Sequence, residues 1–189
     1  MSRYPPIPPS QLNPDQHAAY DESTRIAQDM FGDKFIYKND DGAFIGPFGP
    51  LLYTPSLVDP FFKMAAELGQ IPGLPAAARE TAILATGSTF KAGYELYAHG
   101  KVAASTSLTE RQISSIKEGK KPDGLDEACQ VAFDVAVELS QKQGPLSDET
   151  FQQASKALGQ HGTAALIHYV AFYAYTSVFL NGVAAPVPE

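Results

Sequence analysis

The feature that most constrains the fold is a C-terminal run, residues 162–180, that is apolar on nearly every side of a helix. A helix without a polar face lies either at the centre of a large core or across a membrane. The run contains histidine, tyrosine, threonine and serine side chains, and no Lys or Arg flanks it, so we expect a core helix and no membrane contact. Because a chain of 189 residues offers little core to bury such a helix completely, the sequence also predicts a homo-oligomer.

Start and stop signals predict seven to eight helices, and no strand pattern is convincing. Asn13, Pro14 and Gln16 form a capping-box start, and Thr109 with Gln112 forms a second one. The signals predict a helix between Asn13 and Gly32, one between Asp59 and Gly69, two at about 76–89 and 92–105, one between Thr109 and Gly119, one over about 128–139, one between Ser147 and Gly159, and the C-terminal helix over about 162–180.

Two segments are expected outside these helices. Residues 1–12 are rich in proline and should form an extended arm on the surface or on a neighbouring subunit, with residues 13–189 forming a single domain. Residues 40–53 form a long loop of glycine, proline and aromatic residues. Such a loop either lines a pocket or simply packs over the core.

Composition excludes several classes of protein. The net charge is −7 and no run of basic residues occurs, which argues against nucleic acid or an anionic membrane as a partner. Cys129 is the one cysteine, so no intramolecular disulfide and no Cys-x-x-Cys motif exist, and a buried, unreactive thiol is expected. The N-terminus has no apolar signal-peptide region, and the default location is cytoplasmic.

The stretch from Arg79 to His99 concentrates the titratable side chains. Glu95 and His99 are spaced i, i+4, so on one helix the carboxylate can orient the imidazole and raise its pKa, as an acid–base group requires. Glu80 joins them if its own helix folds back. The alternative is a surface pair between Lys91 and Glu95, worth about 0.3–0.5 kcal/mol.

Other polar residues are candidates for substrate contact. Tyr173, Ser177 and Asn181 form one polar row on the C-terminal helix, although they also suffice to satisfy one another or to cap its end. Tyr94 lies within the central stretch and either packs or donates a hydrogen bond. None of the histidines belongs to a metal-ligand pattern, so no metal is expected.

A series of short motifs follows one order along the chain: Gly46-Pro47-Phe48, Leu51-Leu52-Tyr53-Thr54-Pro55, Arg79-Glu80-x-Ala-Ile-Leu, Tyr94-Glu95-x-x-x-His99, Leu108-Thr109, Gly119 and Leu180-Asn181-x-Val-x-x-Pro186. In this order and spacing, the motifs resemble the carboxymuconolactone decarboxylase-like family, which includes alkylhydroperoxidase D-like proteins. The resemblance covers most of the chain from about residue 42 onward, and it implies an all-α fold and a homo-oligomer, commonly a trimer or hexamer.

The resemblance also shows what this chain lacks. The peroxidase branch carries two redox cysteines between a Glu and a His, and the matching positions here are Ala92 and Glu95, between Glu80 and His99. Thiol peroxidase chemistry requires a thiolate, so a peroxide reductase is the less favoured alternative. A non-catalytic oligomeric ligand-binding protein is another.

The decarboxylase branch needs no cysteine. We therefore expect a cofactor-free lyase acting on a small oxygenated substrate, a lactone or carboxylic acid, with His99 as proton donor, Glu95 as its orienting partner and Glu80 as a second acid–base group. The side chains expected to contact the substrate are Lys91, Tyr94, Tyr53, Tyr173 and Asn181.

Overall fold

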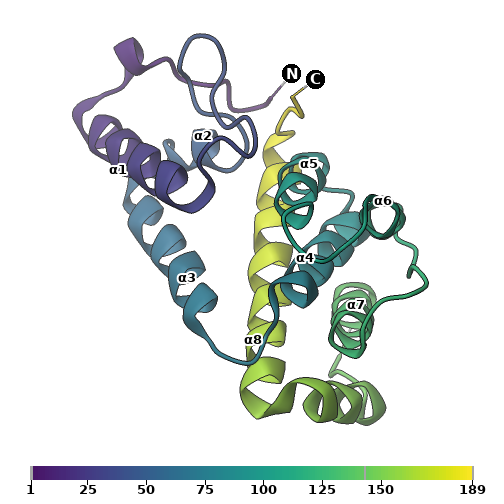
Figure 1. Cartoon of the computed structure of the whole chain (residues 1–189). Helices are drawn as coiled ribbons and strands as arrows, with labels where there is room; N and C mark the ends of the chain where they lie inside the picture. Colours follow the sequence, from purple (N-terminus) through teal and green to yellow (C-terminus); the bar gives the residue numbers. More distant parts are fainter. Residues whose placement is uncertain (1, 143, 189) are drawn as a thin grey trace.

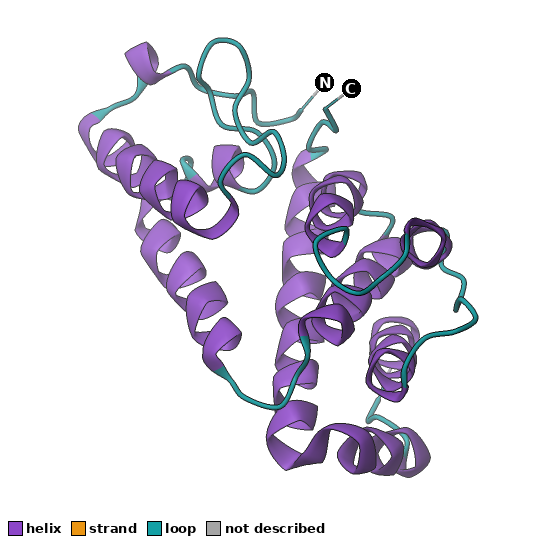
Figure 2. Ribbon diagram, in the orientation of Figure 1, coloured by secondary structure: helices purple, strands orange, loops and turns teal. Residues whose placement is uncertain are grey.

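The computed structural model describes residues 2–142 and 144–188, and this part of the chain consists of helices and loops (Figure 2). Its one β pairing is an isolated bridge between Lys38 and Phe44. The eight α-helices are α1 (Pro14–Phe31), α2 (Phe48–Leu51), α3 (Val58–Gln70), α4 (Ala76–Phe90), α5 (Gly93–Ala103), α6 (Glu110–Lys117), α7 (Glu127–Gln141) and α8 (Asp148–Val183). The all-α prediction and the number of helices are confirmed.

The predicted helix starts are borne out by cap geometry. The side chain of Asn13 accepts from the backbone of Gln16 at 2.9 Å, and the Gln16 amide oxygen accepts in return, which closes a capping box on α1. Thr109 and Gln112 close the same kind of box on α6. Ser147 caps α8. These local hydrogen bonds satisfy backbone N–H groups that have no partner inside the helix, so short sequence signals are enough to place the boundaries.

The core forms where α4 packs against α7 and α8 (Figure 1). Ten of the 15 residues of α4 are buried, on every side of the helix. Many of them are alanines, whose short side chains let neighbouring helices approach closely. Among the residues that the structure describes, α4 is therefore more completely enclosed than the C-terminal helix that the sequence marks as central.

The range α8 spans the two helices that the sequence separates. Gly159 has φ 67° and ψ 179°, which is not a helical conformation, so the chain kinks between the two helices at the glycine that the sequence marks as a stop (Figure 1). Beyond the bend, one side of α8 packs on α4 and α7, but an apolar stripe stays exposed. The stripe consists of Ala164, His168, Ala171, Tyr175 and Val178. Burial of α8 on all sides is thus not achieved within one chain, and coverage by a second copy stays a prediction.

By length and composition, α8 is the one helix in the described part of the chain that is apolar enough to cross a membrane. Its most apolar window has a mean hydropathy of 1.3, and 44% of that window is buried inside the protein. The contacts of α8 with α4 and α7 are those of a core helix, which is the arrangement expected from its polar side chains.

Helices α1 to α3 form a second layer beside α4–α8 (Figure 1). The two layers meet through aromatic residues: the rings of Phe61 on α3 and Phe172 on α8 lie 4.9 Å apart. The N-terminal arm contains a 3-10 turn, Pro9–Gln11, and it lies on this chain's own surface. There the backbone of Arg3 donates to Val183 at 2.8 Å, at the end of α8. The candidate site lies between the two layers.

Candidate active site

Three buried polar side chains meet at the contact between α4 and α5. Glu80 comes from α4, and Glu95 and His99 come from α5; they are 2%, 3% and 7% exposed. The chain reverses between the helices at Lys91, which adopts the left-handed conformation with φ 54°. This reversal folds Glu80 back onto His99, so the condition for Glu80 to join the pair is met.

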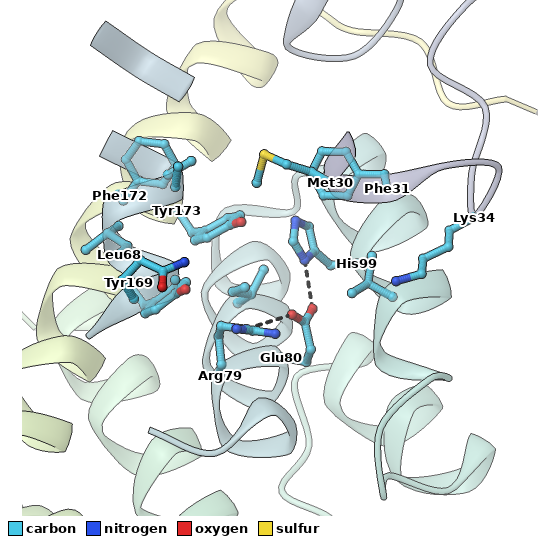
Figure 3. Close-up of a pocket in the computed structure, with 16 residues that line it drawn as sticks. Met30, Phe31, Lys34, Leu68, Arg79, Glu80, His99, Tyr169, Phe172 and Tyr173 are labelled. Atoms are coloured by element: carbon cyan, nitrogen blue, oxygen red, sulfur yellow. Dashed lines mark hydrogen bonds and ion pairs between the residues drawn. The ribbon is translucent and has the colours of Figure 1, made fainter. Parts of the chain in front are cut away.

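Each nitrogen of the His99 ring faces a different carboxylate. Nδ1 lies 2.8 Å from Oε2 of Glu80, and Nε2 lies 3.3 Å from Oε1 of Glu95. Arg79 completes the row, since its Nε donates to Oε1 of Glu80 at 3.3 Å (Figure 3). A buried charge is tolerated only when it is paired and hydrogen-bonded, and this row pairs each of its members.

The environment shifts the pKa values of both α5 side chains. Burial raises the pKa of Glu95. The charge of His99 acts to lower it and the charge of Glu80 raises it further, so the pKa of Glu95 is about 7. Burial acts to lower the pKa of His99, but the charges of Glu80 and Glu95 and the hydrogen bond that Nδ1–H donates to Glu80 outweigh it, so the pKa is raised. Glu95 therefore exchanges a proton near neutral pH, where an unperturbed glutamate is fully ionised.

Two neighbouring cavities flank His99. The larger, about 300 Å³, is lined by Glu80 and Arg79 together with side chains of α1, α3 and α8. The smaller, about 50 Å³, is lined by Glu95 and mainly by aromatic and other apolar side chains. His99 lines both. The row of acid–base groups thus runs from the cavity that Arg79 and Glu80 line to the more apolar one, and Glu95 is its member at the second cavity.

Two predicted tyrosines lie at these cavities. The ring of Tyr173 stands edge-on to His99, with ring centres 4.8 Å apart, and it lines both cavities (Figure 3). Burial raises the pKa of Tyr173 well above its usual value, so its hydroxyl stays protonated. Tyr94 lines the smaller cavity, and its hydroxyl donates to the backbone oxygen of Ile36 at 2.8 Å. That bond leaves Tyr94 a mainly structural role.

The other three predicted contacts lie outside both cavities. Lys91 is exposed at the reversal after α4, and it cannot share a helical row with Glu95 because a different helix begins beyond it. The hydroxyl of Tyr53 donates to Pro5 at 2.9 Å and so fastens the N-terminal arm. The amide of Asn181 donates to the backbone oxygen of Phe90 at 2.6 Å and ties the end of α8 to α4. These two hydrogen bonds give Tyr53 and Asn181 structural partners within the chain, so neither side chain requires a substrate to satisfy it.

Several lining residues escaped sequence reasoning. Arg79 was visible as part of the motif with Glu80, but nothing in its spacing indicated that it would face a cavity. Lys34 follows the end of α1 and carried no signal at all. Met30 and Phe31, at the end of α1, line both cavities, although in the sequence they form only part of the apolar side of a helix. Contributions from a separate layer cannot be placed without the tertiary fold.

In the part of the chain that the structure describes, the site residues do not resemble a metal centre or a reactive thiol site. Within residues 2–142 and 144–188, no three His, Cys, Asp or Glu side chains converge as metal ligands. Glu80 and Glu95 bind opposite nitrogens of His99, so they cannot meet at one ion. Cys129 lies in the core on α7, and burial raises the pKa of its thiol to about 12. A thiol of that kind is a poor nucleophile.

Comparison with known proteins identifies the fold but no specific activity. No family model and no curated protein matches the sequence. Among solved structures, the chain is similar to an alkylhydroperoxidase AhpD core, an uncharacterized peroxidase-related protein from Ralstonia eutropha JMP134. The TM-score is 0.77 and the sequence identity is 18%, and the match covers 100% of this chain and 93% of that one. A peroxidase-related protein from Silicibacter sp. TM1040 gives a TM-score of 0.69 and 16% identity over 89% and 86% of the two chains.

A third similar structure is an enzyme. The debrominase Bmp8, as its C82A variant in complex with 2,3,4-tribromopyrrole, gives a TM-score of 0.73 and 13% identity over 98% of this chain and 91% of that one. Identities this low establish the fold and leave the reaction open. The chain therefore has the all-helical fold of alkylhydroperoxidase D-like proteins.

Proposed function

We propose that this protein is a cofactor-free acid–base enzyme, and more specifically a carboxy-lyase that protonates a carbon of a small unsaturated substrate as that carbon loses CO2. One observation carries the proposal: the carboxyl group of Glu95, with a pKa raised to about 7, lines an apolar cavity while it contacts His99. A general acid works best when its pKa lies near the working pH, and burial has brought Glu95 to that range.

The geometry favours a different division of roles from the one predicted from spacing. Glu80 binds Nδ1 of His99 at 2.8 Å and so fixes the ring, which is the task that the sequence assigned to Glu95. Glu95 lies at the other nitrogen and lines the apolar cavity, so it is the proton donor to the substrate. His99 then returns a proton to Glu95 through Nε2.

The proposed step balances in atoms and charge. The bond between the substrate carbon and its carboxylate breaks, CO2 leaves, and the electron pair stays on the carbon as an enolate-like anion. The proton of Glu95 forms the new C–H bond, the Glu95 carboxylate regains a proton from His99, and His99 takes a proton from solvent, so each turnover consumes one proton. The hydroxyl of Tyr173, which stays protonated and lines both cavities, donates a hydrogen bond to the anionic oxygen of the intermediate.

Two features support an enzyme of this kind over the alternatives. A peroxide reductase needs a reactive thiol, and Cys129 is buried in the core with a raised pKa. A passive binding protein would gain nothing from three buried titratable groups, which weaken folding relative to apolar side chains of similar size. The debrominase with a similar fold was solved with a small halogenated ring, which supports a small ring as the kind of molecule bound.

The test is CO2 release in D2O from a panel of unsaturated, aromatic and lactone carboxylic acids. We expect turnover of at least one member, with deuterium on the carbon that lost CO2. E95Q and H99A should lower kcat at least about 100-fold, since general acids contribute about 10²–10⁴. The matched control is E67Q, an exposed carboxylate on α3, which should leave kcat unchanged.

Three outcomes contradict the proposal. Unchanged turnover in E95Q removes Glu95 from the mechanism. Peroxide reduction that is abolished when Cys129 is alkylated indicates the peroxide reductase. Saturable binding of panel members without any CO2 release indicates a ligand-binding protein.

A further inference from the structure

We propose that the larger cavity is a carboxylate subsite, in which Arg79 and Lys34 hold the anionic group of a substrate whose apolar part extends along the shared wall toward the smaller cavity beside Glu95. The ligand class is thus a small, ring-bearing or otherwise apolar monoanion. The inference rests on the proposed function only in calling this molecule a substrate, because binding itself requires no proton transfer.

Arg79 is held in place with donors to spare. Its side chain is 30% exposed, its Nε donates to Glu80 at 3.3 Å, and its guanidinium lies 6.0 Å from the ring centre of Tyr169. A guanidinium has five N–H donors, so Nε uses one and the two terminal nitrogens keep four for Tyr169 and for a ligand. A planar, partly buried fork of this kind matches a carboxylate in two parallel hydrogen bonds.

The charges around the larger cavity favour an anion. Arg79 and Lys34 line it as cations, His99 lines it with a raised pKa, and Glu80 is the one carboxylate among its lining residues. Glu80 is already shared between Arg79 and His99. Figure 3 shows the ammonium group of Lys34 directed toward the His99 side of this cavity. The whole chain carries a net charge of −7, so this local excess of cations is not a general property of its surface.

The apolar part of the ligand is placed by the smaller cavity. Phe48, Phe61 and Phe62 line this cavity and not the larger one. The two cavities share six lining residues, His99 and Tyr173 among them, so they adjoin along one wall. A single molecule can therefore leave its carboxylate at Arg79 and direct the edge of a ring toward Glu95. The subsite would prefer an anionic ligand whether that carboxylate is lost as CO2 or remains on the bound molecule.

The experiment compares two probes of nearly equal shape, 3-phenylpropionate and 3-phenylpropanamide, by isothermal titration calorimetry on the full chain. We expect wild-type protein to bind the acid at least about tenfold more tightly than the amide, since hydrogen bonds to a charged group are stronger than those to a neutral one. R79Q should abolish this preference. F62L should weaken both probes alike, because Phe62 contacts only the apolar part.

A matched pair of charge reversals guards against a folding defect in R79Q. K34E changes an exposed lysine at the cavity and should reduce the preference for the acid. K63E makes the same change at an exposed lysine of α3 that does not line either cavity, and it should leave the preference intact. Equal binding of the two probes, no saturable binding of the acid, or equal effects of K34E and K63E would overturn the subsite.

The E95Q variant separates this inference from the proposed function. Because Glu95 does not line the larger cavity, E95Q should keep the preference for the acid while CO2 release is lost. Loss of the preference in E95Q contradicts the subsite. Retained CO2 release in E95Q contradicts the proposed function and leaves the binding result standing.

Discussion

Replacement of Glu95 by glutamine tests the electrostatics of the site without any substrate. Glutamine keeps the size of the side chain and an oxygen for His99, but it carries no charge at any pH. In the folded protein the pKa of Glu95 is raised from 4.5 to about 7, mainly by burial. One pKa unit is worth about 1.4 kcal/mol, so ionising Glu95 costs the folded state about 3 kcal/mol relative to the unfolded chain.

The sign of the effect follows from the proton count. Between pH 4.5 and 7 the folded protein holds a proton on Glu95 that the unfolded chain has already released, so stability falls as the pH rises through this window. The raised pKa of His99 acts in the same direction, because its contribution is also lost as the pH rises through the folded pKa. Subtracting the E95Q value from the wild-type value gives the part that depends on the Glu95 charge, including its effect on the pKa of His99.

We expect the free energy of unfolding of wild type, relative to E95Q, to fall by about 2–3 kcal/mol between pH 5 and pH 8. The measurement is urea unfolding followed by far-UV circular dichroism at four pH values in that range. E67Q, on the exposed surface of α3, is the control, and its difference from wild type should stay flat. A flat difference for E95Q as well would show that Glu95 is ionised throughout and would refute its role as a neutral-pH acid.

The remaining predictions concern the thiol, a tight turn and the exposed stripe of α8. Cys129 is buried with a pKa raised to about 12, so iodoacetamide should not label the native protein within minutes at pH 8, whereas the urea-unfolded chain should gain one adduct by mass spectrometry. Gly46 has φ 63°, and a Cβ at this position would overlap the ring of Tyr94. The G46A variant should therefore have a free energy of unfolding about 2 kcal/mol or more below that of wild type, measured by urea unfolding. An unchanged free energy of unfolding would contradict this packing. Tyr175 and Val178 are 50% and 57% exposed, and we expect a second copy of the chain to cover them. Changing both residues to lysine should therefore convert a trimer or hexamer to a monomer, as measured by light scattering. A monomeric wild-type protein would contradict this assembly.

Local rules predicted most of the helices, because caps and glycine stops act within a few residues. The starts of α1, α6 and α8 follow from Asn13, Thr109 and Ser147, whose side chains bond backbone groups three residues away. The sequence misjudged which helix is central, since its hydrophobicity pattern does not show that the alanines of α4 pack against two neighbours at once. How completely a helix is buried depends on its contacts with segments distant in the sequence, and the hydrophobic periodicity of the helix itself does not report those contacts.

The candidate site was predictable only in part, for a similar reason. Spacing alone pairs Glu95 with His99 on one helix, but the close bond of Glu80 to Nδ1 depends on how α4 and α5 are folded against each other. The division of roles that we propose therefore differs from the one that spacing suggests. Lys34 belongs to the other layer of the molecule, so no pattern within the central stretch indicated it.

The arrangement of the buried row argues for chemistry more strongly than its composition does. Three titratable side chains in a core weaken folding compared with leucine or methionine, and a structural ion pair would need only two of them. Here Glu80, which also pairs with Arg79, already binds Nδ1 of His99, so the pairing does not require Glu95. Burial makes the charged form of Glu95 costly and raises its pKa to about 7. That cost is explained if Glu95 must hold a proton at neutral pH beside an apolar cavity.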